Sequence, residues 1–151
     1  MYEDILLPID GSDAAEAAVE HAADLARTYD ATVHVFCAVE PIPTAEADAA
    51  TLIETMQEDA ERVVADAASR LREDGVDVTT AVRTGSAYRT ILSYVEDAGV
   101  DLVVMGTHGR SGVGRVLLGS VTEKVVRHAD VPVLTVRRAD ADEEGAADEE
   151  S

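Results

Sequence analysis

The stretch that decides the fold is residues 102–122, which read LVVMGTHGRSGVGRVLLGSVT. It opens with an apolar run that shows no alternation, passes through five glycines and ends where a helical pattern starts. Such an apolar run is typical of a parallel strand that is covered on both faces. The glycine-rich connection would then lie beyond the carboxyl end of the strand, which is where open parallel sheets bind their ligands.

This stretch also contains no Asp or Glu, although the chain has 31 acidic residues among 151. A window of this length should hold about four acids by chance. Arg110 and Arg115 add positive charge, and glycines allow close approach of a ligand because they lack a Cβ. These glycines are Gly106, Gly109, Gly112, Gly114 and Gly119. The pattern indicates a cradle for phosphate.

Four further apolar runs alternate with helical patterns, which is the signature of a parallel sheet with helices on both faces. The predicted strands are residues 4–9, 32–39, 77–83, 101–105 and 132–137. The first and fourth should lie centrally, because their apolar runs do not alternate.

Four helices are expected between and after these strands. The first follows a cap at Ser12 or Asp13, with an inward stripe of Ala15, Ala18, Val19, Ala22, Leu25 and Ala26. The second stops at Gly75 and has an inward stripe of Leu52, Met56, Ala60, Val63, Ala67 and Leu71. The third opens at residues 85–86 and ends near Gly99, and the fourth runs from Ser120 to about His128.

The length and the 46% hydrophobic content predict one domain, residues 1–137. The acidic segment 138–151 is expected to be a disordered tail, because it offers too little apolar surface to pack. The lone Cys37 is expected to be an inert core thiol. No run of about 18 apolar residues exists and the start does not resemble a signal peptide, so we expect a soluble, cytoplasmic protein without a membrane segment.

The net charge of −19 comes with a single lysine, Lys124. This composition suggests a host with a saline cytoplasm, since near about 1 M salt the Debye length falls to about 3 Å and screens the self-repulsion. The alternative is an acidic protein that merely avoids nucleic acids and membranes. Both interpretations exclude DNA or RNA as a partner, because no basic face exists to neutralise phosphates.

Two turns should fall at the ligand-binding edge of the sheet: residues 8–12, which read PIDGS, and the glycine stretch. If the first and fourth strands are neighbours, the two turns flank one crevice. The Asp10 carboxylate could there accept hydrogen bonds from ribose hydroxyls or from the adenine amine. The backbone N–H groups at the start of the fourth helix, residues 120–122, would hold the phosphates.

Structural alternatives remain open for these residues. Ser120 and Glu123 have the spacing of a capping box, and Asp10 before Gly11 suits a turn in which the carboxylate bonds the backbone. His108 is either a phosphate donor or an exposed loop residue without a role, and the other histidines show no metal-site spacing. The chain has no Walker P-loop, no full dinucleotide fingerprint and no nucleophile elbow, so no catalytic residue is predicted.

Gly106, Gly109, Gly119 and Ser120 follow the pattern Gly-x2-Gly-x9-Gly-Ser/Thr. This pattern resembles that of the nucleotide-binding members of the universal stress protein family. The resemblance extends from residues 5–12, ILLPIDGS, to residues 131–136, VPVLTV. It implies a doubly wound α/β fold with strand order 3-2-1-4-5 and an ATP, accompanied by Mg²⁺, in the crevice between the first and fourth strands.

The resemblance also implies roles for individual positions. Asp10 would contact the adenosine, and the residues beside it or near the base would be Pro8, Ile9 and Ala38. The loop would be lined by Met105, Gly106, Gly109 and Arg110. The phosphates would be held by Gly119, Ser120 and Val121.

Members of the family form homodimers, often through the fifth strand. The resemblance therefore implies that a second copy of this chain is its partner. The sequence gives independent support, because residues 131–136 form an apolar strand expected at the sheet edge, where Pro132 is tolerated. We therefore expect an ATP-binding switch in a stress response. A slow ATPase or phosphotransferase, with Asp10 or His108 positioning water or an acceptor, is one alternative, and a nucleotide-free dimeric scaffold is another.

Overall fold

Helices and strands alternate along the part of the chain that the computed structural model describes, residues 1–41, 49–107 and 118–137. The first half contains β1 (Asp4–Pro8), α1 (Asp13–Tyr29), β2 (Thr32–Val39), α2 (Ala49–Glu73) and β3 (Asp77–Thr84). The second half contains α3 (Ala87–Ala98), β4 (Leu102–Gly106), α4 (Ser120–His128) and β5 (Val133–Val136). The predicted tail 138–151 lies outside these ranges.

The strands form one parallel sheet in the order β3-β2-β1-β4-β5, which confirms the predicted fold class and strand order. β1 is the middle strand, with Ile5 paired to Val33 of β2 on one side and to Leu102 of β4 on the other. Because all strands are parallel, the carboxyl ends of β1, β2 and β4 lie at the same edge of the sheet.

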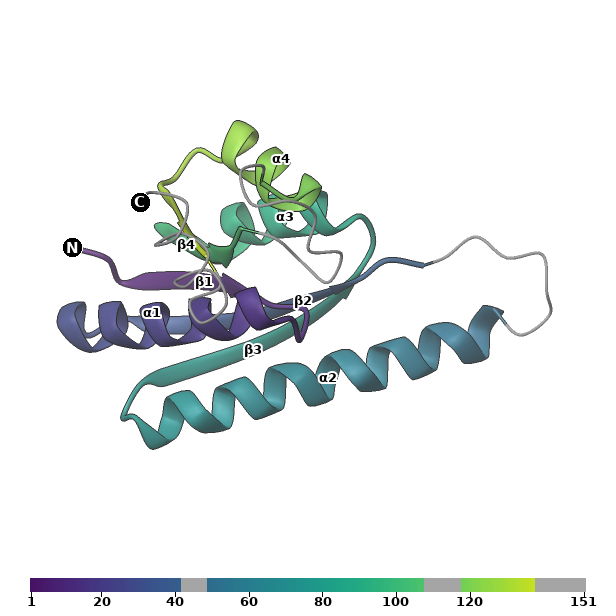
Figure 1. The fold of residues 1–151 in the computed structure, drawn as a ribbon, viewed down its shortest axis with the longest axis horizontal. Coiled ribbons are helices and arrows are strands. Elements are labelled where there is room, and N and C mark those ends of the chain that lie inside the picture. Colours follow the sequence, from purple (N-terminus) through teal and green to yellow (C-terminus); the bar gives the residue numbers. More distant parts are fainter. Residues whose placement is uncertain (42–48, 108–117, 138–151) are drawn as a thin grey trace, which may run out of the picture.

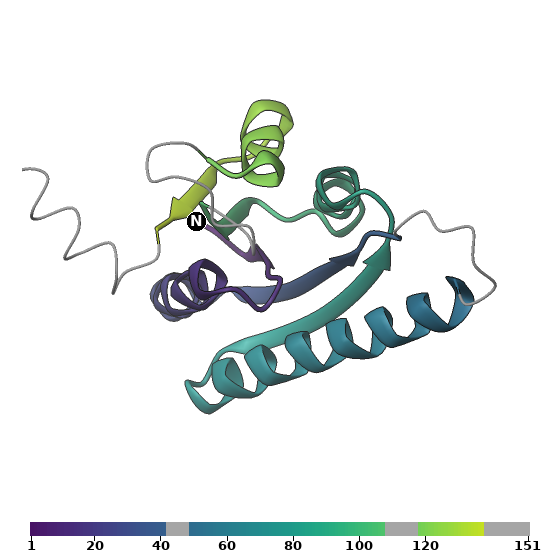
Figure 2. The ribbon, with the colours of Figure 1, turned by 45° about the vertical axis from the view of Figure 1, so that its right-hand side comes forward.

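Helices cover both faces of the sheet, with α1 and α2 on one side and α3 and α4 on the other (Figures 1 and 2). Successive residues of β1 point to opposite faces, so Ile5 and Leu7 pack against α1 and α2 while Leu6 packs with α3 and α4. All three side chains are fully buried. This two-sided burial is why the apolar run of β1 does not alternate.

The helix boundaries follow local backbone chemistry. Ser12 caps α1, since its Oγ accepts a hydrogen bond from the Ala15 amide at 3.3 Å. α3 ends on Gly99, whose positive φ of 67° suits a residue without a Cβ. Gly75, with a φ of 82°, turns the chain after α2. These ends match the sequence predictions.

Some predicted boundaries and core positions need correction. β5 starts at Val133 instead of residue 132, because Pro132 has no N–H, although its carbonyl still accepts a hydrogen bond from Val103 at 3.0 Å. β1 ends at Pro8 instead of Ile9, and β3 continues to Thr84. Leu52, expected to face inward, is 39% exposed, because the first turns of α2 project beyond the ends of β2 and β3 (Figure 2).

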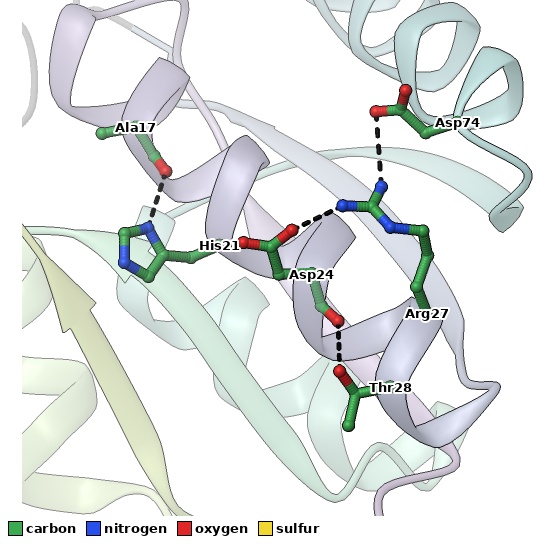
Figure 3. Close-up of polar contacts among 6 residues, drawn as sticks. All are labelled: Ala17, His21, Asp24, Arg27, Thr28 and Asp74. Carbon is green, nitrogen blue, oxygen red and sulfur yellow. Dashed lines mark hydrogen bonds and ion pairs between the residues drawn. The ribbon is translucent and has the colours of Figure 1, made fainter.

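Surface ion pairs join the two helices that share a face. Arg27 of α1 contacts Asp24 on its own helix and, at 3.6 Å, Asp74 just after α2 (Figure 3). Arg70 of α2 lies 2.6 Å from Glu16 of α1. All of these side chains are substantially exposed, so each pair contributes little to stability. Within the described ranges, no helix combines the length and the apolar character needed to span a membrane.

A buried polar network ties β1, β2 and α3 together. His34 of β2 lies between Asp4, whose Oδ1 is 3.0 Å from Nε2, and Tyr94 of α3, whose hydroxyl is 2.7 Å from Nδ1. The bonding is complete when Nε2–H donates to Asp4 and the Tyr94 hydroxyl donates to Nδ1. His34 is therefore a core residue that joins three elements.

Burial raises the pKa of the Tyr94 phenol above its usual value. The Arg83 guanidinium, 4.9 Å from the ring centroid, lowers this pKa, whereas the Asp4 carboxylate raises it. The net rise means that the fold favours the neutral phenol, which is the form that donates to His34.

We predict that the free energy of unfolding falls more steeply above about pH 10 in the wild type than in Tyr94→Phe. Because the folded pKa is raised, the stabilisation is complete below the unfolded value of about 10 and is lost as the pH rises through the folded value. Urea unfolding at a series of alkaline pH values measures the difference. Tyr29→Phe, which removes an exposed phenol, should keep the wild-type dependence. Equal slopes in wild type and Tyr94→Phe would contradict the assignment.

Candidate functional site

A cavity of about 580 Å³ opens at the carboxyl edge of the sheet, where β1, β2 and β4 end. It reaches both faces, because its walls come from α1 and α2 as well as from α3 and α4. Its size falls within the usual range for small-molecule sites. The location is the one at which open parallel sheets bind ligands, where the strand order reverses.

The structure brings the predicted site residues together around this cavity, as far as it describes them. The predicted residues that line it are Pro8, Ile9, Asp10, Ala38, Met105, Gly106, Gly119, Ser120 and Val121. Gly109 and Arg110 lie outside the described residues, as does His108. The expectation that the Asp10 turn and the start of α4 flank one crevice is confirmed, while the ligand-binding roles stay predictions.

The Asp10 turn has a conformation set by its own side chain. Asp10 Oδ1 accepts a hydrogen bond from the Ser12 amide at 2.9 Å, and Gly11 adopts a φ of 84°, which strongly favours glycine. The turn interpretation of Asp10 is therefore confirmed. It is compatible with ligand binding, because an ionised carboxylate accepts hydrogen bonds at about four positions. The turn holds this half-buried carboxylate at the cavity.

The predicted capping box at Ser120 is wrong. The N-cap is Gly119, whose carbonyl accepts from the Glu123 amide at 2.9 Å, and within the described residues no side-chain hydrogen bond caps the helix. α4 thus begins one residue earlier than the box requires, and Ser120 is its first helical residue. The amides of residues 120–122 have no acceptor within the helix, and these residues line the cavity at the positive end of the helix dipole.

Gly119 has no conformational need to be glycine. Its φ of −62° and ψ of 159° are extended values open to any residue. Its amide donates to the Thr107 carbonyl at 2.7 Å, which fixes it beside the end of β4. A side chain at this position would stand at the cavity wall, so glycine here leaves the wall open to close approach of a ligand.

One further hydrogen bond holds α4 against the sheet, and a second ties the end of β4 to β5. The Thr122 hydroxyl donates to the Gly106 carbonyl at 2.8 Å, and the Thr107 amide donates to the Val136 carbonyl at 2.9 Å. Thr122 is 3% exposed, so its hydroxyl bond is protected from water. These bonds position the amides of the first turn of α4, a role for the Thr122 side chain that the sequence did not reveal.

Sequence reasoning missed the other residues that line the cavity, because most of them carry the pattern of a core. The missed residues are Ser12, Ala15, Phe36, Cys37, Val39, Glu40, Met56, Asp59, Ala60, Val63, Ala87 and Ile91. Cys37 is buried as predicted, yet it also faces the cavity. An apolar stripe on a helix indicates which face is buried, but it does not show whether a cavity adjoins that face.

The charged residues among the described lining are all acidic: Asp10, Glu40 and Asp59. Asp59, on α2, is paired with Arg62 at 2.9 Å. An anionic group would therefore be repelled from the side of α2 and attracted to the amides of α4. In the described ranges no set of three or more His, Cys, Asp or Glu residues could hold a metal ion.

The sequence model of the Universal stress protein family matches residues 1–137. The chain belongs to the universal stress protein family. Universal stress protein MJ0531 of Methanocaldococcus jannaschii is 34% identical over 142 residues, which cover 91% of this chain and 84% of that protein. The resemblance seen in the glycine pattern is thereby confirmed.

Solved structures of relatives share the fold of this universal stress protein. The structure of MJ0577, also from Methanocaldococcus jannaschii, has a TM-score of 0.84 and 31% identity, and the match covers 93% of this chain and 99% of that one. A universal stress protein solved in complex with cAMP has a TM-score of 0.72 and 25% identity, covering 91% and 99% of the two chains.

We predict that Thr122→Val lowers the free energy of unfolding by about 1 kcal/mol, because it removes the buried hydroxyl that donates to the Gly106 carbonyl. Urea unfolding in high salt measures the change. Thr28→Val is the matched control, since the Thr28 hydroxyl bonds the Asp24 carbonyl at 2.9 Å but is exposed to water (Figure 3). A loss no larger in Thr122→Val than in Thr28→Val would show that the bond does not anchor α4.

Proposed function

We propose that this universal stress protein binds ATP with Mg²⁺ in the cavity and acts as a nucleotide-dependent switch in a stress response. The observation that carries the proposal is the composition of one cavity, which combines the Asp10 carboxylate, apolar walls and the first-turn amides of α4, which have no acceptor within the helix. Each part matches one part of a nucleotide: ribose hydroxyls, a planar base and phosphates.

The distribution of charge supports one orientation of the nucleotide. The phosphates belong at α4, because its amides and dipole favour anions. The base belongs on the side of α2, where Val39, Met56 and Val63 offer apolar surface and Glu40 and Asp59 repel phosphate. Asp10 lies at the end of β1, between these two sides of the cavity, where its carboxylate would accept bonds from the ribose hydroxyls.

The residues present fit a Mg²⁺ ion that arrives with the phosphates. Mg²⁺ prefers oxygen ligands and is commonly held by one or two protein groups together with phosphate oxygens, without an all-protein cage. The Ser120 hydroxyl would be the oxygen ligand on the α4 side of the cavity wall, where the phosphates are placed. The ion would neutralise part of the phosphate charge, and this reduces the repulsion between the nucleotide and an acidic protein.

Relatives support an adenine nucleotide as the ligand class. The universal stress protein crystallised with cAMP shares the fold and 25% of its residues with this chain. The adenine and ribose of that compound are common to ATP. We take the triphosphate as the ligand because the glycine spacing resembles that of the ATP-binding members of the family.

A slow ATPase or phosphotransferase is the second candidate, favoured by the same cavity. Phosphoryl transfer needs mainly positioning and charge neutralisation, and the α4 amides and Asp10 face one space. The two candidates differ in the fate of bound ATP. A switch keeps the ATP through prolonged incubation, whereas an ATPase releases phosphate at a rate that depends on Asp10.

We predict that protein purified in high salt releases adenine nucleotide on denaturation or binds added Mg-ATP. Gly119→Val should abolish this binding, because its side chain would occupy the wall that the phosphates approach, while circular dichroism stays unchanged. Calorimetry and chromatography of the released ligand measure both. Ala65→Val on the exposed side of α2 is the control for introducing a valine away from the cavity. Absence of nucleotide together with no binding of Mg-ATP would favour the scaffold interpretation and contradict the proposal.

We also propose that the protein is a homodimer paired through β5. Within the described part of the chain, β5 is an edge strand that pairs only with β4, and Leu134 is 37% exposed on it. An apolar edge with unpaired backbone groups favours pairing with a second copy. The saline host suggested by the acidic composition stays a prediction.

We predict that Leu134→Arg converts the dimer to a monomer, because it places a charge in the interface. Light scattering coupled to size exclusion in high salt measures the mass. Val126→Arg, which changes a 44% exposed residue on α4, should leave the dimer intact. A wild type that is monomeric at micromolar concentration, or a dimer that tolerates Leu134→Arg, would contradict the β5 interface.

A further inference from the structure

Tyr88, in the first turn of α3, gathers two cations around its ring. The Arg89 guanidinium carbon lies 5.6 Å from the ring centroid, and Arg89 Nε donates to the Tyr88 hydroxyl at 3.0 Å. Lys124 of α4 places its Nζ 5.0 Å from the same centroid. Both distances are within the range of cation–π attraction. The aromatic ring thus holds two positive charges at the junction of α3 and α4.

These two cations differ from five of the nine basic residues that the structure describes. Ion pairs with carboxylates are formed by Arg27, Arg62, Arg70, Arg83 and Arg127. Arg89 and Lys124 form none with any residue that the structure describes, although acidic residues outnumber basic ones by 31 to 12. Two like charges on one ring repel each other, and an anion bound between or beside them would relieve the repulsion.

The position of Tyr88 places this pair beside the cavity. Ala87 and Ile91, which flank Tyr88 on α3, both line the cavity. Lys124 follows Ser120 by four residues on α4, so the two residues share a face of the helix. Helical side chains lean toward the N-terminus, so Lys124 lies over the turn whose amides line the cavity.

We propose that Lys124 and Arg89, positioned by Tyr88, contact the outer phosphates of the bound nucleotide and give the site its preference for a longer phosphate chain. This inference rests on the proposed nucleotide-binding function. The amides of α4 would hold the phosphates nearest the cavity, and a nucleotide with a single phosphate would end before it reaches the two side chains. Both cations are exposed, so they are accessible to a ligand that extends from the cavity mouth.

The test is calorimetric titration of the full chain with AMP, ADP and ATP at one fixed salt and Mg²⁺ concentration. Lys124→Gln should weaken ATP binding about three- to fivefold, the effect of losing one exposed charge pair, and leave AMP binding unchanged. The double variant with Arg89→Gln should lose more, and Lys124→Arg should retain the affinity for ATP. Tyr88→Leu should behave like Lys124→Gln, whereas Tyr88→Phe keeps the ring and should resemble the wild type more closely.

Arg127→Gln is the matched control, because Arg127 lies on the same helix but is paired with Glu123. It should alter none of the three affinities. Equal losses for AMP and ATP, or an ATP affinity that survives Lys124→Gln with Arg89→Gln, would overturn the proposed contact while leaving nucleotide binding intact. A wild type that binds none of the three nucleotides would contradict the proposed function itself, and this inference with it.

Discussion

Burial of β1 on both faces is the constraint on which the rest of the structure depends. Ile5, Leu6 and Leu7 are all fully buried, and only the middle of a sheet covered by helices on both sides offers that environment. With β1 in the middle, a strand lies on each side of it, and these strands are β2 and β4, which end at the same edge because the sheet is parallel. The Asp10 turn and the start of α4 therefore meet at one cavity as a consequence of burying three aliphatic side chains.

The sequence predicted what depends on local pattern and on that burial. The strands and the central position of β1 and β4 followed from apolar periodicity, whereas the full strand order followed from the family resemblance carried by the glycine pattern. The convergence of Asp10 with Ser120 followed from placing β1 beside β4. The capping box was predicted wrongly, because Ser120 and Glu123 have the right spacing whichever residue accepts the first helical hydrogen bond. Only the geometry shows that the Gly119 carbonyl accepts this bond. A sequence motif identifies the residues of a helix start but not their positions within it.

Other features could not be predicted, because they join residues distant in sequence. Asp4, His34 and Tyr94 come from three elements, and nothing in the surroundings of each residue marks it as part of one network. Met56 and Val63 carry the same helical spacing as core residues, so the pattern does not separate the cavity wall from the core. Sequence reasoning thus found the residues at strand ends, where turn chemistry leaves a signal, and missed those on helix faces.

Electrostatics decides how such an acidic protein could hold an anion. With a net charge of −19, the long-range potential opposes the approach of a nucleotide, and only short-range groups can reverse that effect. At a salt concentration of about 1 M, long-range repulsion is screened within about 3 Å, whereas hydrogen bonds from the amides of α4 act at contact distance. Lys124 and Arg89 also act at short range, because the Tyr88 ring holds them in place. The acidic surface and an anion site are therefore compatible, since they operate over different distances.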